Sequence, residues 1–369
     1  MQAAIFLEQA LAPVSGGTGR YSVELAAALV RTANPGDSVR SWTAWHRDTG
    51  PAVVAGVTGP RRLPLSRRAL AEAWRYGLGP APRDVDVLHA PTLLVPPRRR
   101  YPLVVTIHDA VPWTHPELLT PHGARWHRVM AERAVRTAAA IGVPTQAVAD
   151  ELAAVLPAVR AARVHVLGAG VARAVLREPD AVYAQRVAAA LDLPERFVLS
   201  LATLEPRKGL DVLIDALATI GAGAPPLLVV GQAGWGGVDP AVAASRAGLP
   251  PGRLRVLGRL GDPELAVVLR RATLLAAPSR AEGFGLPVAE AMAVGTPVVC
   301  SDAPALVEVA GGAAAVVPRG DAGALAAAIA KLLDDPAERD RMAAAGRARS
   351  AAFDWDLVAE RAWALYRSL

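Results

Sequence analysis

The segment RAEGFGLPVAEAMAVG, residues 280–295, lies between two short apolar runs, TLLAAPS at 273–279 and TPVVCSD at 296–302. An apolar run, a helix-like segment and a second apolar run predict a strand, a helix and another strand. This pattern places Glu282 before the helix and Glu290 inside it, with GFGLPVA between them. One rigid element would therefore hold two carboxylates at different depths beside the end of a strand.

The same alternation of strand and helix runs through the chain in two similar halves. Short apolar runs occur as AAIFLEQ, DVLHAP, LVVTIHD and AIGVPT, and the series repeats after residue 195 as RFVLSLA, PLLVVG, LRVLG, TLLAAPS and TPVVCSD. Nearly continuous apolar strands are typical of parallel sheets covered by helices on both faces. Ligands bind such sheets outside the carboxyl ends of the strands. We therefore expect an α/β fold whose functional motifs directly follow strands.

Length and composition favour a globular protein of two domains. The chain has 369 residues, of which 52% are hydrophobic and 20% charged, and this length exceeds what one hydrophobic core usually organises. Its one cysteine, Cys300, excludes an intramolecular disulfide, and the apolar neighbours of Cys300 predict a buried thiol in a strand. The N-terminal apolar run soon meets Glu8, and no run of about 18 apolar residues follows. We expect a cytoplasmic protein without a spanning helix.

Positive charge is concentrated in the first half of the chain. Residues 1–170 hold 19 Arg and Lys against 12 Asp and Glu, a net charge of +7, whereas residues 171–369 hold 21 against 22, a net charge of −1. A solvated arginine-rich face is one interpretation, and a surface for anionic lipid or an anionic acceptor is the other. No nucleic-acid recognition module accompanies the charge, so we predict no nucleic-acid partner. The arginines concerned include Arg61, Arg62, Arg67, Arg68, Arg98, Arg99 and Arg100.

The glycine-rich segment SGGTGRY, residues 15–21, follows the first predicted strand. Gly16 and Gly17 would let the backbone approach a ligand closely, and a helix predicted to begin near Tyr21 would attract an anion to its N-terminus. A tight turn without a ligand explains the glycines equally well. The segment matches neither the Rossmann G-x-G-x-x-G pattern nor a P-loop.

His108 and Asp109 follow the apolar run LVVTI. A polar pair at the carboxyl end of a strand faces the ligand crevice, which favours a functional His108 over a surface histidine. All seven histidines lie in the first half, but His115, His122 and His127 are spaced by seven and five residues and do not form the i, i+4 pair of a helical zinc site. We predict no metal site.

Arg207 and Lys208 stand in LEPRKG, between the strand FVLSLA and a helix predicted to begin near Leu210. Two cations beside a helix N-terminus suit a diphosphate. A solvated turn is the alternative interpretation. Glu205 and Pro206 before the cations and a glycine after them favour a loop of defined shape.

The order SGGTGRY, TIHD, LEPRKG, GRL at 258–260, then Glu282-GFGLPVA-Glu290 and TPVVCSD, resembles the retaining GT-B glycosyltransferases of the family that includes bacterial mannosyltransferases and sucrose synthase-like enzymes. The resemblance covers nearly the whole chain, and the glutamate pair around GFGLP is its most specific element. It implies two Rossmann-like parallel-sheet domains that face each other across a cleft.

The resemblance also implies a role for each matching residue. Glu290 would accept hydrogen bonds from both ribose hydroxyls of a nucleotide sugar, and Glu282 would meet hydroxyls of the donor sugar, because a carboxylate offers two acceptor oxygens. Arg207 and Lys208 would clamp the diphosphate, and His108 would lie near the reacting face of the sugar. The other implied substrate-binding residues are Gly16, Gly17, Asp109, Arg259, Leu260, Gly283, Phe284, Gly285 and Leu286.

The chemistry implied is transfer of a sugar from a nucleotide diphosphate sugar to a hydroxyl acceptor. Negative charge develops on the leaving phosphate, and cations and helix N–H groups stabilise it. The resemblance implies retention of configuration through attack on the same face of the sugar. We expect no metal and no cofactor, since Arg207 and Lys208 take the role of a metal. The LEPRK form weakly favours GDP-mannose as the donor.

We expect three parts along the chain. Residues 1–172 would form the acceptor-binding domain, residues 176–352 the nucleotide-sugar-binding domain, with a linker near Gly168 to Pro179, and residues 353–369 a helix that crosses back onto the first domain. The acceptor would be lipid-linked or otherwise anionic, and the basic first domain would contact an anionic cytoplasmic membrane face peripherally.

Other classes of protein remain open at this point. A sugar-nucleotide epimerase or a glycosyl phosphorylase could share the fold, although a phosphorylase needs a lysine-bound pyridoxal phosphate and the chain has only Lys208 and Lys331. A catalytically inactive regulator that binds a nucleotide sugar is the non-enzyme alternative. The presence of Glu282 and His108 argues against it, because a pure binder has less need of groups around the reacting carbon.

Overall fold

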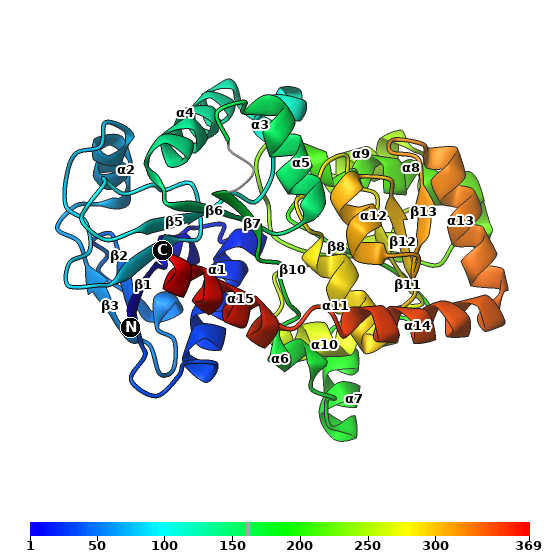
Figure 1. The fold of residues 1–369 in the computed structure, drawn as a ribbon. Helices are drawn as coiled ribbons and strands as arrows, with labels where there is room; N and C mark the ends of the chain where they lie inside the picture. The colour runs from blue at the N-terminus through cyan, green and yellow to red at the C-terminus, as the bar shows by residue number, and fades with distance from the viewer. Residues whose placement is uncertain (160–162) are drawn as a thin grey trace. The chain divides into compact units, whose positions relative to one another are not determined.

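The chain folds into two compact units in the computed structural model, which describes residues 1–159 and 163–369 (Figure 1). The first unit comprises Met1–Ala169 together with Asp354–Leu369, and the second comprises Gly170–Phe353. Among the described residues, each unit holds one sheet of parallel strands with helices between them. The predicted α/β class with two parallel-sheet domains is confirmed.

The first unit holds a seven-stranded sheet in the order β3-β2-β1-β4-β5-β6-β7, counted over the described residues. Its strands are β1 (Gln2–Phe6), β2 (Ser38–Thr43), β3 (Thr58–Arg62), β4 (Val87–Ala90), β5 (Leu103–Thr106), β6 (Ala140–Val143) and β7 (Val164–Val166). Its α-helices are α1 (Gly16–Arg31), α2 (Arg67–Arg75), α3 (Val111–Thr114), α4 (Pro121–Thr137), α5 (Gln146–Val155) and α15 (Trp355–Ser368). The 3-10 helices are η1 (Glu8–Leu11), η2 (Gly50–Ala52) and η3 (Pro116–Leu118).

Two groups of helices pack in the first unit. Trp74 of α2, Met130 of α4 and Leu152 of α5 share one buried core with strand residues such as Leu88. The last helix, α15, packs against α1, and the indole of Trp363 donates a hydrogen bond of 3.0 Å to the backbone carbonyl of Leu29. Figure 1 shows α15 in red beside α1 in blue. The end of the chain is therefore part of the first unit.

The second unit holds a six-stranded sheet in the order β10-β9-β8-β11-β12-β13. Its strands are β8 (Val198–Leu201), β9 (Leu227–Val230), β10 (Leu254–Gly258), β11 (Leu274–Ala277), β12 (Val298–Ser301) and β13 (Ala315–Val317). Its α-helices are α6 (Arg173–Leu176), α7 (Ala181–Ala190), α8 (Leu210–Ile220), α9 (Pro240–Arg246), α10 (Asp262–Arg271), α11 (Leu286–Val294), α12 (Pro304–Ala310), α13 (Ala322–Asp334) and α14 (Pro336–Ser350). The 3-10 helices are η5 (Pro206–Lys208) and η6 (Gly221–Gly223).

The core of the second unit joins the sheet to its helices. Leu213 of α8 and Ile329 of α13 are buried with Leu274 of β11, while α11 packs against α10 and α14. Cys300 lies buried in β12, as predicted, and burial raises the pKa of its thiol to about 12. This thiol is therefore protonated and inert at neutral pH.

One expectation about an element boundary is wrong. The helix expected near Tyr21 begins at Gly16, so the glycine run forms the first turn of α1. Gly19 permits this start, because a Cβ atom there would lie 2.7 Å from the Cβ of Ser15. The segment expected to be a linker, near Gly168 to Pro179, includes the boundary between Ala169 and Gly170 and also the short helix α6.

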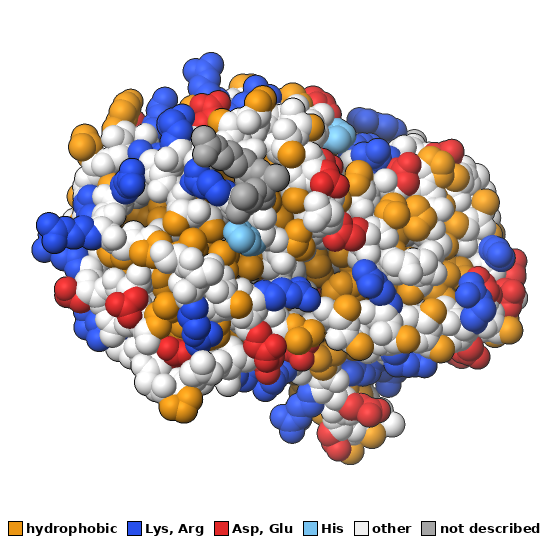
Figure 2. Space-filling view, in the orientation of Figure 1, with side chains coloured by type: hydrophobic (Ala, Val, Ile, Leu, Met, Phe, Trp, Pro, Cys, Tyr) orange, Lys and Arg blue, Asp and Glu red, His pale blue; other side chains and the backbone are white. Residues whose placement is uncertain are grey.

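Basic side chains are spread over the molecular surface. Figure 2 shows Lys and Arg side chains on one face of the molecule with Asp and Glu among them. The arginines selected from the sequence are mostly exposed, and only Arg67 among them is half-buried. Within residues 1–159 and 163–369, each helix is too short or too polar to cross a bilayer.

Candidate functional site

Three of the predicted catalytic residues meet at the carboxyl ends of β8 and β11, which are neighbours in the second sheet. Arg207 and Lys208 lie in η5, after β8, and Glu282 follows β11. Lys208 Nζ donates a hydrogen bond to Glu282 Oε1, and Arg207 Nη1 lies 3.6 Å from Glu282 Oε2. Two cations therefore converge on one carboxylate whose side chain is only 10% exposed.

Glu205 holds Arg207 in this arrangement. The buried Glu205 carboxylate accepts a hydrogen bond of 2.8 Å from Arg207 Nε through Oε1 and one of 2.7 Å from the indole of Trp235 through Oε2. Gly209 ends the turn with a φ of 66°, and a Cβ atom there would collide with the carbonyl of Pro278. Glycine is thus required for the cations to approach the loop after β11.

Arg280 ties the two loops together. Its backbone N–H donates to the carbonyl of Arg207 at 2.7 Å, and its guanidinium donates to the carbonyl of Pro206 at 2.8 Å. The same guanidinium forms a bidentate pair with Asp211, at 2.9 and 2.6 Å. Bidentate arginine–carboxylate pairs are rigid, so Arg280 fixes η5 against the segment that carries Glu282.

Glu282 remains ionised in this environment. Burial acts to raise the pKa of its carboxyl, but the charges of Lys208 and Arg207, with hydrogen bonds from Lys208 and Ser279, outweigh burial and lower the pKa below its ordinary value. Ser279 Oγ donates to Glu282 Oε1 at 2.9 Å, and Ser301 in turn donates to the carbonyl of Ser279 at 2.5 Å. An ionised carboxylate can only accept hydrogen bonds, so it suits the O–H donors of sugar hydroxyls.

The predicted motif GFGLP forms the start of α11. Gly285 precedes the helix with a φ of 88°, where a Cβ atom would collide with Leu306. Gly283 and Phe284 are buried, and the ring of Phe284 contacts Phe353 edge to face with centroids 5.4 Å apart. Leu286 begins the helix and Glu290 is buried within it, 3% exposed. The helix N-terminus, with its partial positive charge, therefore lies four residues after Glu282.

Arg259 and Leu260 lie in the loop between β10 and α10, at the same edge of the sheet. Arg259 is exposed and Leu260 is half-buried. Gly258, which ends β10, accepts a hydrogen bond of 2.8 Å from the N–H of Gly231 at the end of β9. The loop is thus joined to the glycine-rich segment after β9.

In the first unit, His108 follows β5 at the carboxyl end of the sheet. Its Nε2 lies 2.7 Å from the carbonyl oxygen of Pro91, which can only accept, so Nε2 carries a proton and donates to it. Tyr21 of α1 packs edge to face against the His108 ring, with centroids 4.8 Å apart. Asp109 accepts a hydrogen bond of 3.2 Å from the N–H of Val111 and so caps the following turn.

Gly16 and Gly17 open α1, the helix that also carries Tyr21. Gly16 has a φ of 57° and open space where a side chain would be. The first sheet therefore brings the glycine turn and His108 onto elements that contact each other through Tyr21, whereas Arg207, Lys208 and Glu282 gather in the second unit.

The chain contains two Asp-x-Asp stretches, at residues 84–86 and 354–356, and aspartates of both bind structural partners in the first unit. Asp86 accepts a hydrogen bond of 2.7 Å from the N–H of Gln2. Asp354 caps α15 through the N–H of Asp356, at 2.9 Å, and Asp356 pairs with Arg31 at 2.7 Å. In the described part of the chain, no three His, Cys, Asp or Glu side chains gather as metal ligands would.

Known proteins resemble both units. Residues 15–174 match the family model of glycosyltransferase family 4, and residues 184–349 match that of the glycosyl transferases group 1. D-inositol 3-phosphate glycosyltransferase 1 of Catenulispora acidiphila is 35% identical over 389 residues, which cover 96% of this chain and 91% of that protein. The chain belongs to the group 1 glycosyltransferases.

One further relative matches only part of this glycosyltransferase, and a solved structure matches the fold of its whole length. The phosphatidyl-myo-inositol mannosyltransferase of Mycobacterium leprae is 38% identical over 170 residues, which cover 45% of this chain and only 44% of that protein. The solved sucrose-phosphate synthase from Thermosynechococcus elongatus superimposes with a TM-score of 0.76 at 24% identity, covering 100% of this chain and 98% of that one. That likeness concerns the fold, which is GT-B.

Several residues that support the candidate site of this glycosyltransferase could not be predicted from its sequence. Arg280 pairs with Asp211, 69 positions away, and the carbonyl of Ser279 is held by Ser301, 22 positions away, so nothing in their local pattern indicates these contacts. The segment GQAGWGG, residues 231–237, did carry a usable signal, because it is rich in glycine and directly follows β9. Trp235 from this segment holds Glu205.

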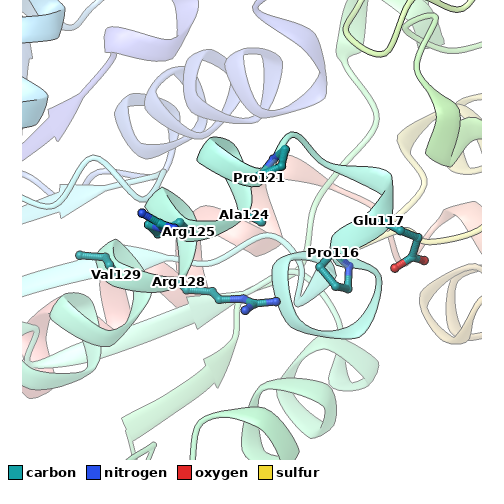
Figure 3. A pocket seen from close by; sticks show the side chains of 7 residues that line it. All are labelled: Pro116, Glu117, Pro121, Ala124, Arg125, Arg128 and Val129. Atoms are coloured by element: carbon teal, nitrogen blue, oxygen red, sulfur yellow. The ribbon is translucent and has the colours of Figure 1, made fainter.

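A separate pocket of about 620 Å³ lies on the first unit of the glycosyltransferase (Figure 3). Figure 3 shows Arg125, Ala124, Arg128 and Val129 on α4, with Pro116 and Glu117 on the neighbouring turn. Arg128 Nε donates to the carbonyl of Pro112 at 2.7 Å, which fixes α4 against the segment after His108. The pocket contains none of the predicted site residues.

Proposed function

We propose that this glycosyltransferase moves a hexosyl group from a nucleotide diphosphate sugar to a hydroxyl acceptor, with retention of configuration. The observation that carries the proposal is the pairing of Lys208 and Arg207 with Glu282 directly before the N-terminus of α11. Two cations beside a helix N-terminus suit a diphosphate, and an ionised carboxylate suits sugar hydroxyls. The second unit would then bind the donor, and the first the acceptor.

The donor half would work by exchange of partners. Lys208 pairs with Glu282, and Arg207 pairs with Glu205. A bound diphosphate would compete for Lys208 and leave the Glu282 carboxylate to accept hydrogen bonds from the donor sugar. Glu205 would keep Arg207 oriented, since its carboxylate accepts a hydrogen bond from Nε. Glu290 would accept hydrogen bonds from the ribose hydroxyls.

The transfer step breaks the bond between the anomeric carbon and the diphosphate oxygen. Negative charge on the leaving phosphate is stabilised by Lys208, Arg207 and the N–H groups at the start of α11. The acceptor hydroxyl attacks the anomeric carbon on the same face, and its proton passes to an oxygen of the leaving phosphate. No protein base is needed, and His108 would contact the sugar near the reacting face. We propose that the reaction needs no metal, because two fixed cations take that part.

We also propose that the protein weakly prefers GDP-mannose as its donor. Its support is the LEPRK segment and the mannosyltransferase named among the relatives. Thermal unfolding with GDP, UDP and dTDP at equal concentration tests which nucleotide base the protein prefers. A ligand that binds only the folded state raises the stability of the protein, and it does so more when it binds more tightly. We expect the largest shift with GDP; equal or larger shifts with UDP would remove the preference.

Product analysis tests the activity itself. The protein is incubated with a panel of nucleotide sugars, with and without polyol and lipid-linked acceptors, and release of nucleoside diphosphate is measured. We expect release that depends on the acceptor, and an unchanged anomeric configuration in the product. Nucleotide binding without release from any donor would instead identify a regulator, and a change of sugar without transfer would identify an epimerase.

The basic first unit supports an anionic acceptor. Its sequence range 1–170 carries the net charge of +7, and each cation near anionic lipid contributes about 1 kcal/mol. We propose that the acceptor is lipid-linked or otherwise anionic, and that the protein meets an anionic membrane face peripherally. Binding to anionic vesicles should then be lost at high salt.

A further inference from the structure

Five arginines line a pocket of about 400 Å³ in the first unit: Arg98, Arg99, Arg100, Arg136 and Arg163. Arg98 to Arg100 precede β5, Arg136 lies in the last turn of α4 before β6, and Arg163 precedes β7. These strands are parallel neighbours, so their amino ends share one edge of the sheet. His108 follows β5 and lies at the opposite edge. The pocket is therefore separate from the proposed transfer site.

The pocket carries positive charge without matching acids. No Asp or Glu side chain is among its described lining residues. Arg99 donates to the carbonyl of Gly79 at 2.9 Å and so frames the pocket. Within residues 1–159 and 163–369, no ion pair involves the side chains of Arg98, Arg100 or Arg136.

Two arginines elsewhere in the same unit illustrate how acids neutralise such charges. Arg31 binds Asp356 at 2.7 Å, and Arg367 binds Asp37 at 2.5 Å. The carboxyl end of α4 offsets only about half a charge in the pocket. Leu369, the last residue of the sequence, also lines the pocket. A backbone carboxylate at Leu369 would still leave the pocket strongly cationic. Cations gathered in a concave site without counter-charges attract an anion from solution.

We infer that this arginine pocket binds a phosphate group. Guanidinium groups are planar forks that match phosphate oxygens in pairs, and several around one pocket can contact one phosphate from different sides. The volume suits a small anionic group rather than a large apolar ligand. The phosphate belongs either to the headgroup of an anionic lipid or to a free phosphorylated molecule.

The test compares two triple variants with the same loss of charge. The pocket variant is Arg98→Gln, Arg100→Gln and Arg136→Gln. The control is Arg47→Gln, Arg62→Gln and Arg68→Gln, three exposed arginines of the same unit that do not line the pocket. Exposed positions should tolerate glutamine, and the single charge reversal Arg100→Glu serves as a second pocket variant.

Two probes distinguish the sources of phosphate. Cosedimentation uses phosphatidylglycerol and phosphatidylcholine vesicles, and calorimetry uses inorganic pyrophosphate. A Lys208→Ala background removes pyrophosphate binding by the proposed donor site, so the result does not depend on the proposed function. A lipid site predicts that the pocket variant binds phosphatidylglycerol vesicles at least about tenfold more weakly than the control, because only the pocket variant lacks the guanidinium groups that would contact the phosphate directly.

A site for a free phosphorylated molecule predicts loss of pyrophosphate binding in the pocket variant alone, with equal vesicle binding by both variants. The inference is overturned if the pocket variant and the control match each other in both assays. Equal weakening of vesicle binding in both variants, without a difference towards pyrophosphate, would assign the effect to diffuse surface charge.

Discussion

The phenol oxygen of Tyr366, on the last helix of the chain, lies 2.5 Å from Nδ1 of the buried His89 on β4. His89 Nε2 lies 2.7 Å from the hydroxyl of Thr106, two residues before His108. On the same helix, Trp355 packs edge to face on Tyr21, the residue that packs on the His108 ring. Within the first unit, two sets of buried contacts therefore connect α15 to the segment that carries His108.

Tyr366→Phe should destabilise the first unit while keeping its packing. The change removes only the hydroxyl and leaves Nδ1 of the buried His89 without its partner, which costs about 1–3 kcal/mol of unfolding free energy. Urea unfolding measures this loss. Tyr76→Phe is the matched control, since Tyr76 is 65% exposed and should unfold like the wild type. A Tyr366→Phe protein as stable as the control would show that the contact contributes nothing.

His89 should make stability depend on pH below neutrality. Burial, and then the charge of His108, lowers the pKa of His89 from 6.5 to about 3. The folded protein thus keeps the ring neutral while the unfolded chain takes up a proton near pH 6.5, so stability is full above that pH and is lost as pH falls towards 3. Tyr366 and Thr106 are the hydrogen-bond partners of its ring, and both remain neutral in this range.

The measurement is the free energy of unfolding at pH 7 and pH 5. Between these values His89 should remove about 2 kcal/mol of stability from the wild type, and His89→Asn should lack this loss. His122→Asn, at an exposed position on α4, should keep the dependence of the wild type. The same slope in His89→Asn as in the wild type would mean that His89 does not titrate as argued.

Lys208→Ala should impair transfer far more than it impairs folding. Loss of the cation leaves the developing phosphate charge to Arg207 and the helix N-terminus, and removal of one such group costs about 10²–10³ in kcat. Lys331→Ala, the other lysine of the chain, lies exposed on α13 and should retain full activity. Steady-state rates with a saturating donor give the comparison. Similar rates for the two variants would exclude Lys208 from the transfer step.

Transfer should proceed without a divalent metal. Arg207 and Lys208 provide the positive charge at the carboxyl ends of β8 and β11, so chelation should leave kcat unchanged. The measurement compares rates in excess chelator with rates after manganese or magnesium is added back. Activity that disappears in chelator and returns with manganese would contradict this expectation.

Much of the fold follows from the sequence because its signals are local. Apolar runs such as LVVTI and VLSL are too short and too continuous for anything but buried parallel strands, and the polar residues that follow them lie at the ligand edge of each sheet. That rule predicted His108, Arg207, Lys208 and Glu282 as site candidates. It could not predict that α1 begins at Gly16, since this start depends on how closely Gly19 approaches Ser15.

Only the tertiary structure decided which partners hold these residues. Glu205 and Trp235 are 30 positions apart, Arg280 and Asp211 are 69 apart, and His89 and Tyr366 are 277 apart. Such contacts follow from the order of strands in the sheets and from the return of α15 to the first unit. Residue spacing along the chain predicts neither the strand order nor this return. Sequence alone therefore determined which polar residues lie at the ends of strands, because strand ends are local features. The fold determined the charge and orientation of these residues, because burial and hydrogen bonding depend on distant parts of the chain.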